Sequence, residues 1–106
     1  MEKEETKLQN AIRAELSRIG IVRRNNVGTF LTVYGKPIAI GLPGEADLTL
    51  FAKGGKTVFI EIKTVKGRQS RQQKRFQQAV EKLGFSYIIM KSVDDAKKLI
   101  REVENE

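Results

Sequence analysis

Two carboxylates and one lysine have the types and spacing of a hydrolytic site. Asp47 is followed after 13 residues by Glu61, and Lys63 lies two positions further on, in the stretch TVFIEIK. This stretch is rich in β-branched and aromatic residues, which predicts a strand. Because side chains alternate across a strand, Glu61 and Lys63 share one face with Phe59. Taken alone, an exposed surface pair worth about 0–1 kcal/mol would account for these two charges.

The preceding segment brings a second carboxylate toward Glu61. The two predicted strands are 46–52 and 56–63. The three residues KGG join them as a hairpin in which glycine can take the left-handed conformation. In that register Ala52 faces Lys56, and counting back places Asp47 opposite Glu61 on the same face. A two-residue Gly-Gly turn would place Asp47 on the other face.

Paired carboxylates in a strand require a compensating cation. Two like charges about 4 Å apart repel by roughly 4 kcal/mol at an effective dielectric near 20. Lys63 offsets part of this cost, and a divalent ion held by two carboxylates, a backbone carbonyl and waters would offset it fully. Oxygen-only ligation suits Mg²⁺ or Mn²⁺, so we expect one of these ions as the cofactor. Such an ion in a basic protein is suited to phosphodiester hydrolysis.

The composition narrows the possible chemistry. The chain of 106 residues has no Cys and no His, which excludes thiol nucleophiles, disulfides, Cys/His zinc sites and imidazole catalysis. The net charge is +7, with seven basic and one acidic residue in 64–92 against three and five in 93–106. This asymmetry indicates a face that binds nucleic acid, although a solvated helix face has the same composition. The candidate phosphate contacts are Lys66, Arg68, Arg71, Lys74, Arg75 and, ahead of the site, Arg24.

Three helices are predicted around these strands. Apolar residues at spacings of 4, 4 and 3 predict the first over 3–19, ended by Gly20. Ser70 and Gln73 have the types of an N-cap and its capping-box partner, and they open a second helix. Ser92 caps the third. The residues expected on the inner face of the second helix are Phe76, Val80 and Leu83.

The remaining segments complete one α/β domain over residues 1–106. The continuous apolar run 85–90 predicts a fully buried strand, and 21–42 predicts one or two short strands with a looser excursion. Together the elements predict a central mixed sheet flanked by helices. No apolar stretch approaches the roughly 20 residues of a membrane span, and the start MEKEETK lacks a signal-peptide core. We therefore expect a cytoplasmic protein without a membrane partner.

These motifs resemble those of a nuclease family. Asp47 followed by EIK is similar to the PD-(D/E)xK nuclease signature, and the continuation KGRQSRQQKRF resembles its virus-type replication-repair nuclease (VRR-NUC) branch. RNNVG at 24–28 and GLPGEAD at 41–47 are similar to the small stand-alone, phage-type members. The triplet alone arises often by chance, whereas the combination is specific. The resemblance runs from about residue 5 to residue 98, with one departure: three residues separate Pro43 from Asp47.

The resemblance implies a restriction-endonuclease-like core and metal-dependent cleavage of DNA in the cytoplasm of a bacterial or phage-infected cell. It implies Asp47, Glu61 and the Ile62 carbonyl as metal ligands and Lys63 as the catalytic lysine. It also implies Gln73 as a polar group near the site, the alternative being a helix cap alone. Relatives in this branch include Holliday-junction resolvases, so a four-way junction is the first expected substrate. Symmetric cutting of two strands needs two sites related by a two-fold axis, and we therefore expect a homodimer.

The family also places an acidic residue on the first helix. Glu5 begins ETKLQ, which is similar to the family's E-x-x-hydrophobic-Gln. Glu5 falls within roughly 30° of the centre of the apolar stripe, whereas Glu15 lies about 55° away. We expect Glu5 in this role, the alternative being an N-terminal charge favoured by the helix dipole.

Two further functions fit parts of the pattern. A non-catalytic, basic nucleic-acid-binding module would show salt-sensitive binding without cleavage under any divalent ion. A protein-interaction domain with Glu61 and Lys63 merely exposed would show neither DNA retention nor a change of melting temperature with Mn²⁺.

Overall fold

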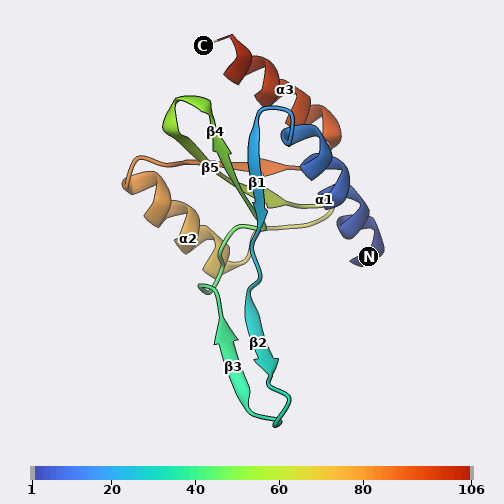
Figure 1. Ribbon diagram of the computed structural model, residues 1–106, viewed down its shortest axis with the longest axis vertical. Coiled ribbons are helices and arrows are strands. Elements are labelled where there is room, and N and C mark those ends of the chain that lie inside the picture. The colour runs from blue at the N-terminus through green and yellow to red at the C-terminus, as the bar shows by residue number, and fades with distance from the viewer. Residues whose placement is uncertain (1, 106) are drawn as a thin grey trace.

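The computed structural model describes residues 2–105 and is built around a four-stranded mixed sheet (Figure 1). The strand order is β1-β4-β5-β6. β1 (Gly20–Arg24), β4 (Leu48–Ala52) and β5 (Lys56–Ile62) are antiparallel neighbours, and β6 (Ser86–Met90) pairs in parallel with β5. The predicted mixed sheet is therefore confirmed.

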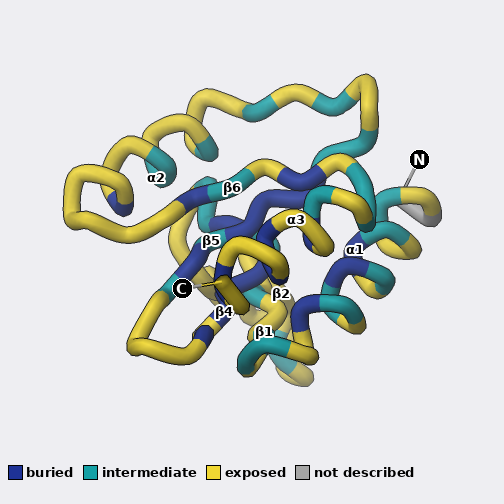
Figure 2. The backbone as a smooth tube through the Cα atoms, turned by 90° about the horizontal axis from the view of Figure 1, so that it is seen from above, coloured by how far each residue is buried: buried dark blue, intermediate teal, exposed yellow. Residues whose placement is uncertain are grey.

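Helices cover both faces of this sheet (Figure 2). α1 (Glu2–Leu16) and α3 (Val93–Glu104) lie together on one face, and α2 (Arg71–Lys82) lies on the other. The α1/α3 face carries the main core, where each fully buried large aliphatic side chain contributes about 1.5–3 kcal/mol. The central members of this core are Ile12, Leu16, Leu48, Leu50, Ile60, Ile62 and Met90. The α2 face carries a smaller cluster of Ala46, Val80 and Tyr87 with Phe59 and Phe76.

The β4–β5 hairpin has the predicted register. Ala52 pairs with Lys56, across the three-residue turn Lys53–Gly55. Gly54 has φ of 78°, a left-handed conformation that glycine takes without steric cost. Leu48 pairs with Ile60, so the next position along places Asp47 opposite Glu61. Because Val58, Ile60 and Ile62 belong to the main core, the alternate residues of β5 face α2.

The second and third helices begin at their predicted caps. The Ser70 hydroxyl accepts from the Gln73 amide, and the Ser70 amide donates to Gln73 Oε1, which completes a capping box. Ser92 and Asp95 form the same arrangement ahead of α3. α1 ends earlier than predicted, because the amides of residues 17–19 bond back to carbonyls of α1 in a turn and Gly20 then opens β1.

Three details of the predicted elements are wrong. Leu83 was expected to face inward, but it follows the last turn of α2 and is 75% exposed. β6 was expected to be fully buried, but it is an edge strand of the sheet and Ile89 is partly exposed. Residues 21–42 contain more than one or two strands: after most of β1 they form β2 (Gly28–Leu31) and β3 (Pro37–Ile40).

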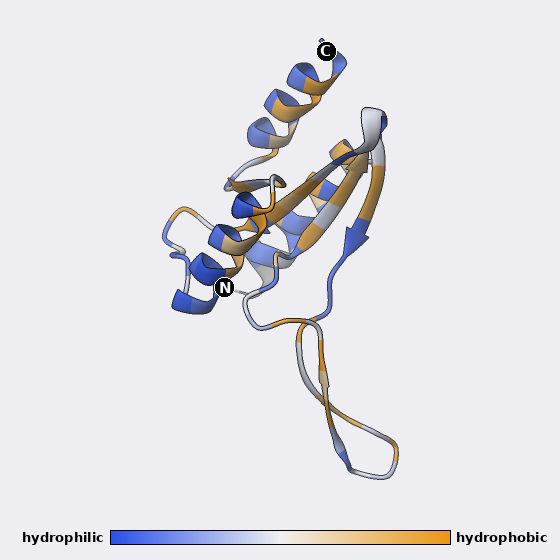
Figure 3. Ribbon diagram, turned by 90° about the vertical axis from the view of Figure 1, so that its left-hand side faces the viewer, coloured by the Kyte–Doolittle hydropathy of each residue, from blue (hydrophilic) through white to orange (hydrophobic). Residues whose placement is uncertain are grey.

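β2 and β3 form a separate two-stranded hairpin that projects from the body (Figures 1 and 3). We refer to residues 28–40 as the arm. The arm extends along the longest dimension of the molecule, whose principal extents are 49 × 31 × 26 Å. Every residue of β2 and β3 is exposed.

Candidate active site

Glu61 is a fully buried carboxylate at the end of β5. Neither Oε1 nor Oε2 has a hydrogen-bond partner among the described residues. Burying a charge without hydrogen bonds costs several kcal/mol, so an ionised Glu61 would destabilise the folded state. The interpretation of Glu61 and Lys63 as an exposed surface pair is therefore wrong, because Glu61 is 0% exposed and this face of the sheet carries the cluster of α2, Phe59 and Tyr87.

Asp47 lies beside Glu61 at the start of β4. Its Oδ2 accepts a hydrogen bond of 2.7 Å from the Ile62 amide, which ties the side chain to the end of β5. Asp47 is half-buried, so one carboxylate of the pair retains access to solvent while the other has none. The two strands thus deliver two acids to one place on the α2 face, as the hairpin register predicted.

The electrostatics of the pair follow from this burial. Burial raises the pKa of Glu61 to about 7, and the negative charge of Asp47 adds to the rise while the Lys63 ammonium opposes it. Burial also raises the pKa of Asp47, and this rise is opposed by the Ile62 amide and by the charges of Lys63 and Arg24. Two neighbouring carboxylates with raised pKa values form a site that gains from a cation.

Lys63 places an ammonium group next to the acids. Its Nζ lies 3.6 Å from Glu61 Oε2, and its side chain is 17% exposed. The Lys63 backbone amide donates to the Met90 carbonyl, which continues the β5–β6 pairing one residue beyond the strand. The ammonium therefore has one side toward Glu61 and access to a molecule arriving from solvent.

The donor set fits a hard divalent cation. Asp47, Glu61 and the Ile62 carbonyl offer oxygen ligands only. Within residues 2–105 the two Glu61 oxygens have no hydrogen bond, and Oε2 has only the 3.6 Å ion pair with Lys63. Within the same residues there is no cluster of three or more acidic, Cys or His side chains arranged to hold a metal. Mg²⁺ is commonly held by one or two carboxylates with water completing its shell, so the smaller set is sufficient.

Asn25 is a residue of this site that the sequence alone did not single out for a role. Its side-chain amide donates to the Ala46 carbonyl at 3.0 Å and to Thr49 Oγ1 at 2.8 Å. Its backbone amide donates to the Asp47 carbonyl at 2.9 Å. These three bonds hold the chain on both sides of Asp47. The RNNVG motif contained the signal, but only the pairing of β1 with β4 reveals what it does.

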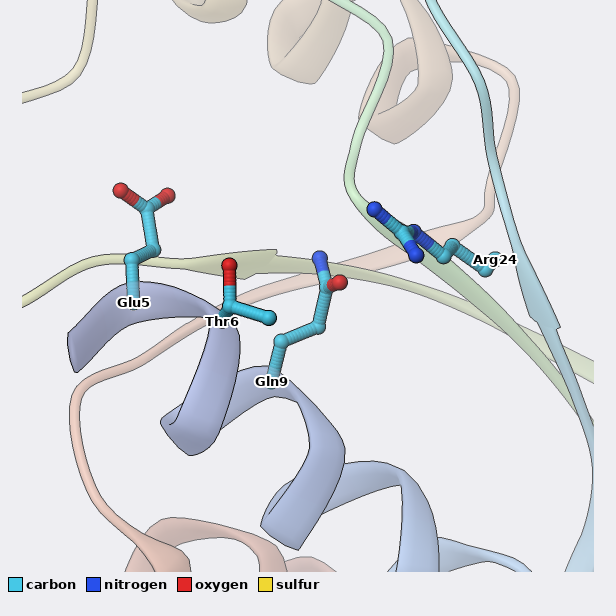
Figure 4. Close-up of a pocket in the computed structure, with 4 residues that line it drawn as sticks. All are labelled: Glu5, Thr6, Gln9 and Arg24. Atoms are coloured by element: carbon cyan, nitrogen blue, oxygen red, sulfur yellow. The ribbon is translucent and has the colours of Figure 1, made fainter. Parts of the chain in front are cut away.

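The first-helix acid lines a pocket between α1 and β1. Glu5, Thr6 and Gln9 of α1 line a pocket of about 250 Å³ with Arg24 of β1. Figure 4 shows the three α1 side chains projecting on one side of the helix and Arg24 reaching toward them from β1. Of the described residues that line this pocket, none is Asp47 or Glu61. Arg24 connects the two places, because its charge lowers the pKa of Asp47.

Glu15 does not share this pocket lining. Its Oε2 forms an ion pair of 3.5 Å with Arg18, one turn further along the chain. Between the two acids, the structure therefore places only Glu5 beside a residue that is close to Asp47. A role for Glu5 at the site stays a prediction.

The predicted phosphate contacts all reach the surface. All six of these basic residues are exposed: Arg24, Lys66, Arg68, Arg71, Lys74 and Arg75. They lie at the end of β1, in the loop after β5 and on the first turns of α2. Gln73, expected near the site, uses its side-chain oxygen in the capping box of α2. The structure thus supports its capping role, and a role at the site stays a prediction.

Gln69 and Tyr87 form a second feature that sequence reasoning missed. Gln69 Nε2 donates to Gln77 Oε1 at 2.8 Å and to the Tyr87 hydroxyl at 3.2 Å, which pins the basic loop to α2 and β6. Burial raises the pKa of Tyr87 to about 12, and the charges of Glu61 and Asp47 contribute to this rise. Tyr87 is buried in the cluster on the α2 face, and its hydroxyl anchors the segment that follows the carboxylate pair.

Comparison with known proteins agrees with this arrangement at the level of fold. No protein-family model matches the chain, and no curated protein matches it. Among solved structures, one described as a VRR_NUC domain is similar over 92% of this chain and 94% of its own, with a TM-score of 0.66 and 23% sequence identity. The chain has the VRR_NUC fold. None of the helices within residues 2–105 has the length and hydrophobicity needed to cross a bilayer.

Proposed function

We propose that this protein belongs to the VRR_NUC nucleases and is a divalent-metal-dependent DNA endonuclease. One observation carries the proposal: Glu61 is fully buried, has no hydrogen-bond donor within the described residues, and lies beside a second carboxylate and a lysine. A fold gains little stability from such a pair, since the replacement of buried charged groups by well-packed apolar residues is often neutral or stabilising. The VRR_NUC fold supports the same conclusion.

Asp47, Glu61 and the Ile62 carbonyl would hold Mg²⁺ or Mn²⁺. When bound, the ion neutralises charge that develops on the phosphate during cleavage and lowers the pKa of water. Asn25 holds the backbone on both sides of Asp47, and the Ile62 amide holds its carboxylate, so the site is formed before substrate arrives.

Lys63 supplies the remaining catalytic group. Its Nζ can donate a hydrogen bond to the attacking water or to a phosphate oxygen while Glu61 keeps it oriented. The exposed basic residues after β5 and on α2 bind phosphates on either side of the bond that is cut, which supplies affinity without sequence preference. The loop that carries Lys66 and Arg68 is held by Gln69, so these contacts keep a fixed direction from the carboxylates.

The proposed substrate is branched DNA, with a four-way junction first, in the cytoplasm of a bacterial or phage-infected cell. A junction is resolved by two symmetric cuts, and one chain offers one carboxylate pair. Two copies related by a two-fold axis would supply both cuts, so the working unit is a homodimer.

The test is cleavage of linear and four-way-junction DNA by purified protein with Mg²⁺ or Mn²⁺. We expect Asp47→Asn and Glu61→Gln to abolish cleavage and Lys63→Ala to lower its rate by about 100-fold or more. Lys82→Ala, at an exposed position of the last turn of α2, is the matched control and should cut like the parent. Calorimetric titration with Mn²⁺ should show binding that Glu61→Gln removes.

Two results would contradict the proposal. If all three variants cut like the parent, the site is elsewhere. If the parent binds DNA with a steep salt dependence but cuts nothing with any divalent ion, the protein is a non-catalytic binding module, which the exposed basic residues alone would support.

A further inference from the structure

The arm is a hydrophobic element whose two strands are exposed along their whole length. Its base, at Thr29, Ala39 and Ile40, lines a pocket with Gln72 of α2. Its exposed large apolar side chains are Phe30, Leu31, Val33, Tyr34, Ile38 and Ile40, with exposed fractions from 43% to 95%. Figure 3 shows the arm projecting from the body with apolar segments along both strands. A two-stranded hairpin of this kind is marginally stable alone in water, so its surface is one that a partner would cover.

The charge of the arm argues for a protein partner. Residues 28–40 contain a single charged residue, Lys36, in a chain with 20 basic and 13 acidic residues. A ribbon that enters a DNA groove would need several cations to meet the phosphates. Among the described residues, every basic side chain other than Lys36 lies outside the arm.

The edges of the arm are suited to self-association. The Thr32 amide donates to the Lys36 carbonyl, so by alternation the amides of Thr29 and Leu31 point away from β3. The outer edge of β3 lacks one such donor, because Pro37 has no amide hydrogen. An antiparallel pair of two β2 edges is an isologous contact, which a two-fold axis generates from one surface.

The exposed apolar surface of the arm can contribute to such a contact. An aromatic side chain offers roughly 150–250 Å², and Phe30 and Tyr34 are 46% and 88% exposed. Leu31 of β2 and Val33 of the turn, 74% and 95% exposed, add aliphatic surface. A standard protein–protein interface buries about 800 Å² on each partner, so the arms would supply a part of the area that a stable dimer needs.

We infer that the arm binds a second copy of this chain, arm to arm, along the outer edge of β2. The inference builds on the homodimer of the proposed function, but it does not depend on the chemistry of that function. Both ends of the arm lead directly to the site: Asn25 lies just before it, and the segment after β3 continues to Asp47. Pairing of the arms thus fixes the distance between the two carboxylate pairs of a dimer.

The first experiment measures mass in solution without DNA or metal. Leu31 is 74% exposed on the arm and Leu83 is 75% exposed on the body, so Leu31→Lys and Leu83→Lys form a matched pair. By sedimentation equilibrium, the parent and Leu83→Lys should have twice the chain mass of 12.0 kDa, and Leu31→Lys should have the single mass. Circular dichroism should show the same folded body for both variants. A parent that stays monomeric at about 100 μM overturns the inference.

The second experiment uses the absence of cysteine in the sequence. Leu31→Cys and Leu83→Cys each introduce the sole thiol of the chain, and mild oxidation should link two copies through position 31 much faster than through position 83. Equal rates at both positions overturn the inference. Neither readout involves cleavage. A dimer joined by its arms that cuts no DNA would refute the proposed cleavage and leave this inference standing. An active monomer would refute this inference and the proposed homodimer, and leave the proposed cleavage chemistry standing.

Discussion

The buried carboxylate of Glu61 makes a quantitative prediction about stability in the absence of divalent ions. The pKa of Glu61 is raised from 4.5 to about 7 in the folded chain. Between these values the folded state binds more protons than the unfolded state, so the free energy of unfolding falls as the pH rises. The stabilising effect of the proton is fully present below about pH 4.5 and is lost as the pH passes through about 7. At 1.36 kcal/mol per pKa unit, the loss is about 3 kcal/mol.

Glu61→Gln removes this dependence, because the amide keeps the shape of the side chain and carries no charge. At pH 8 in EDTA we expect the variant to be more stable than the parent by about 1–3 kcal/mol, since unmet hydrogen bonds of the amide offset part of the gain. For a domain of this size that corresponds to a melting temperature higher by roughly 5–20 °C. At pH 4.5 the two proteins should differ far less.

The assay is urea unfolding followed by circular dichroism at several pH values from 4.5 to 8.5. Glu104→Gln, at an exposed position on α3, is the control and should follow the parent. Saturating Mn²⁺ at pH 8 should then stabilise the parent by about 3 kcal/mol at 100 times the dissociation constant, and should not stabilise Glu61→Gln. If the free energy of unfolding of the parent and of Glu61→Gln changes with pH in the same way, ionisation of Glu61 does not destabilise the folded state. The reasoning from the burial of Glu61 would then be refuted.

Three further predictions follow from named contacts. Asn25→Ala should lower the free energy of unfolding by about 1–3 kcal/mol in urea and should also slow cleavage, because it releases the chain on both sides of Asp47; unchanged cleavage would argue against a positioning role. Gly44→Ala should lower the free energy of unfolding far more than Gly54→Ala in the same urea assay. Both glycines have positive φ, but only at Gly44 would a Cβ lie 2.2 Å from a backbone oxygen of α2. Equal losses of unfolding free energy in the two variants would contradict this. Arg71→Ala should weaken DNA binding and reduce the slope of log affinity against log salt by about 0.9, and an unchanged slope in a fluorescence-anisotropy titration would remove it from the DNA-binding surface.

The pH dependence of metal binding should follow the ionisation of the same carboxylate. Because a cation competes with the proton on Glu61, Mn²⁺ affinity should increase as the pH rises through about 7. Calorimetric titrations at pH 6 and pH 8 test this, and equal affinities would contradict the ligand role of Glu61.

Local chemistry made much of this protein predictable from its sequence. The turn KGG fixed the register of β4 and β5, and that register alone brought Asp47 opposite Glu61. Ser70 and Ser92 marked the starts of two helices, because a capping hydroxyl acts on amides only two or three residues away. These features depend on residues close in sequence, so they could be predicted from the sequence.

Contacts between distant segments decided what the sequence left open. α2 comes from beyond the hairpin and packs Phe76 against Phe59, on the face of β5 that could equally have met solvent. Glu61 shares that face and is fully buried, and this burial raises its pKa. Asn25 acquires its role only when β1 pairs with β4. The sequence also did not reveal that the arm is exposed. An apolar strand has the same sequence pattern whether it packs in the core or projects from the body. Sequence determined which groups could do chemistry and how they are spaced, because spacing is local; the tertiary structure decided which of them lost water, because desolvation depends on what packs on top.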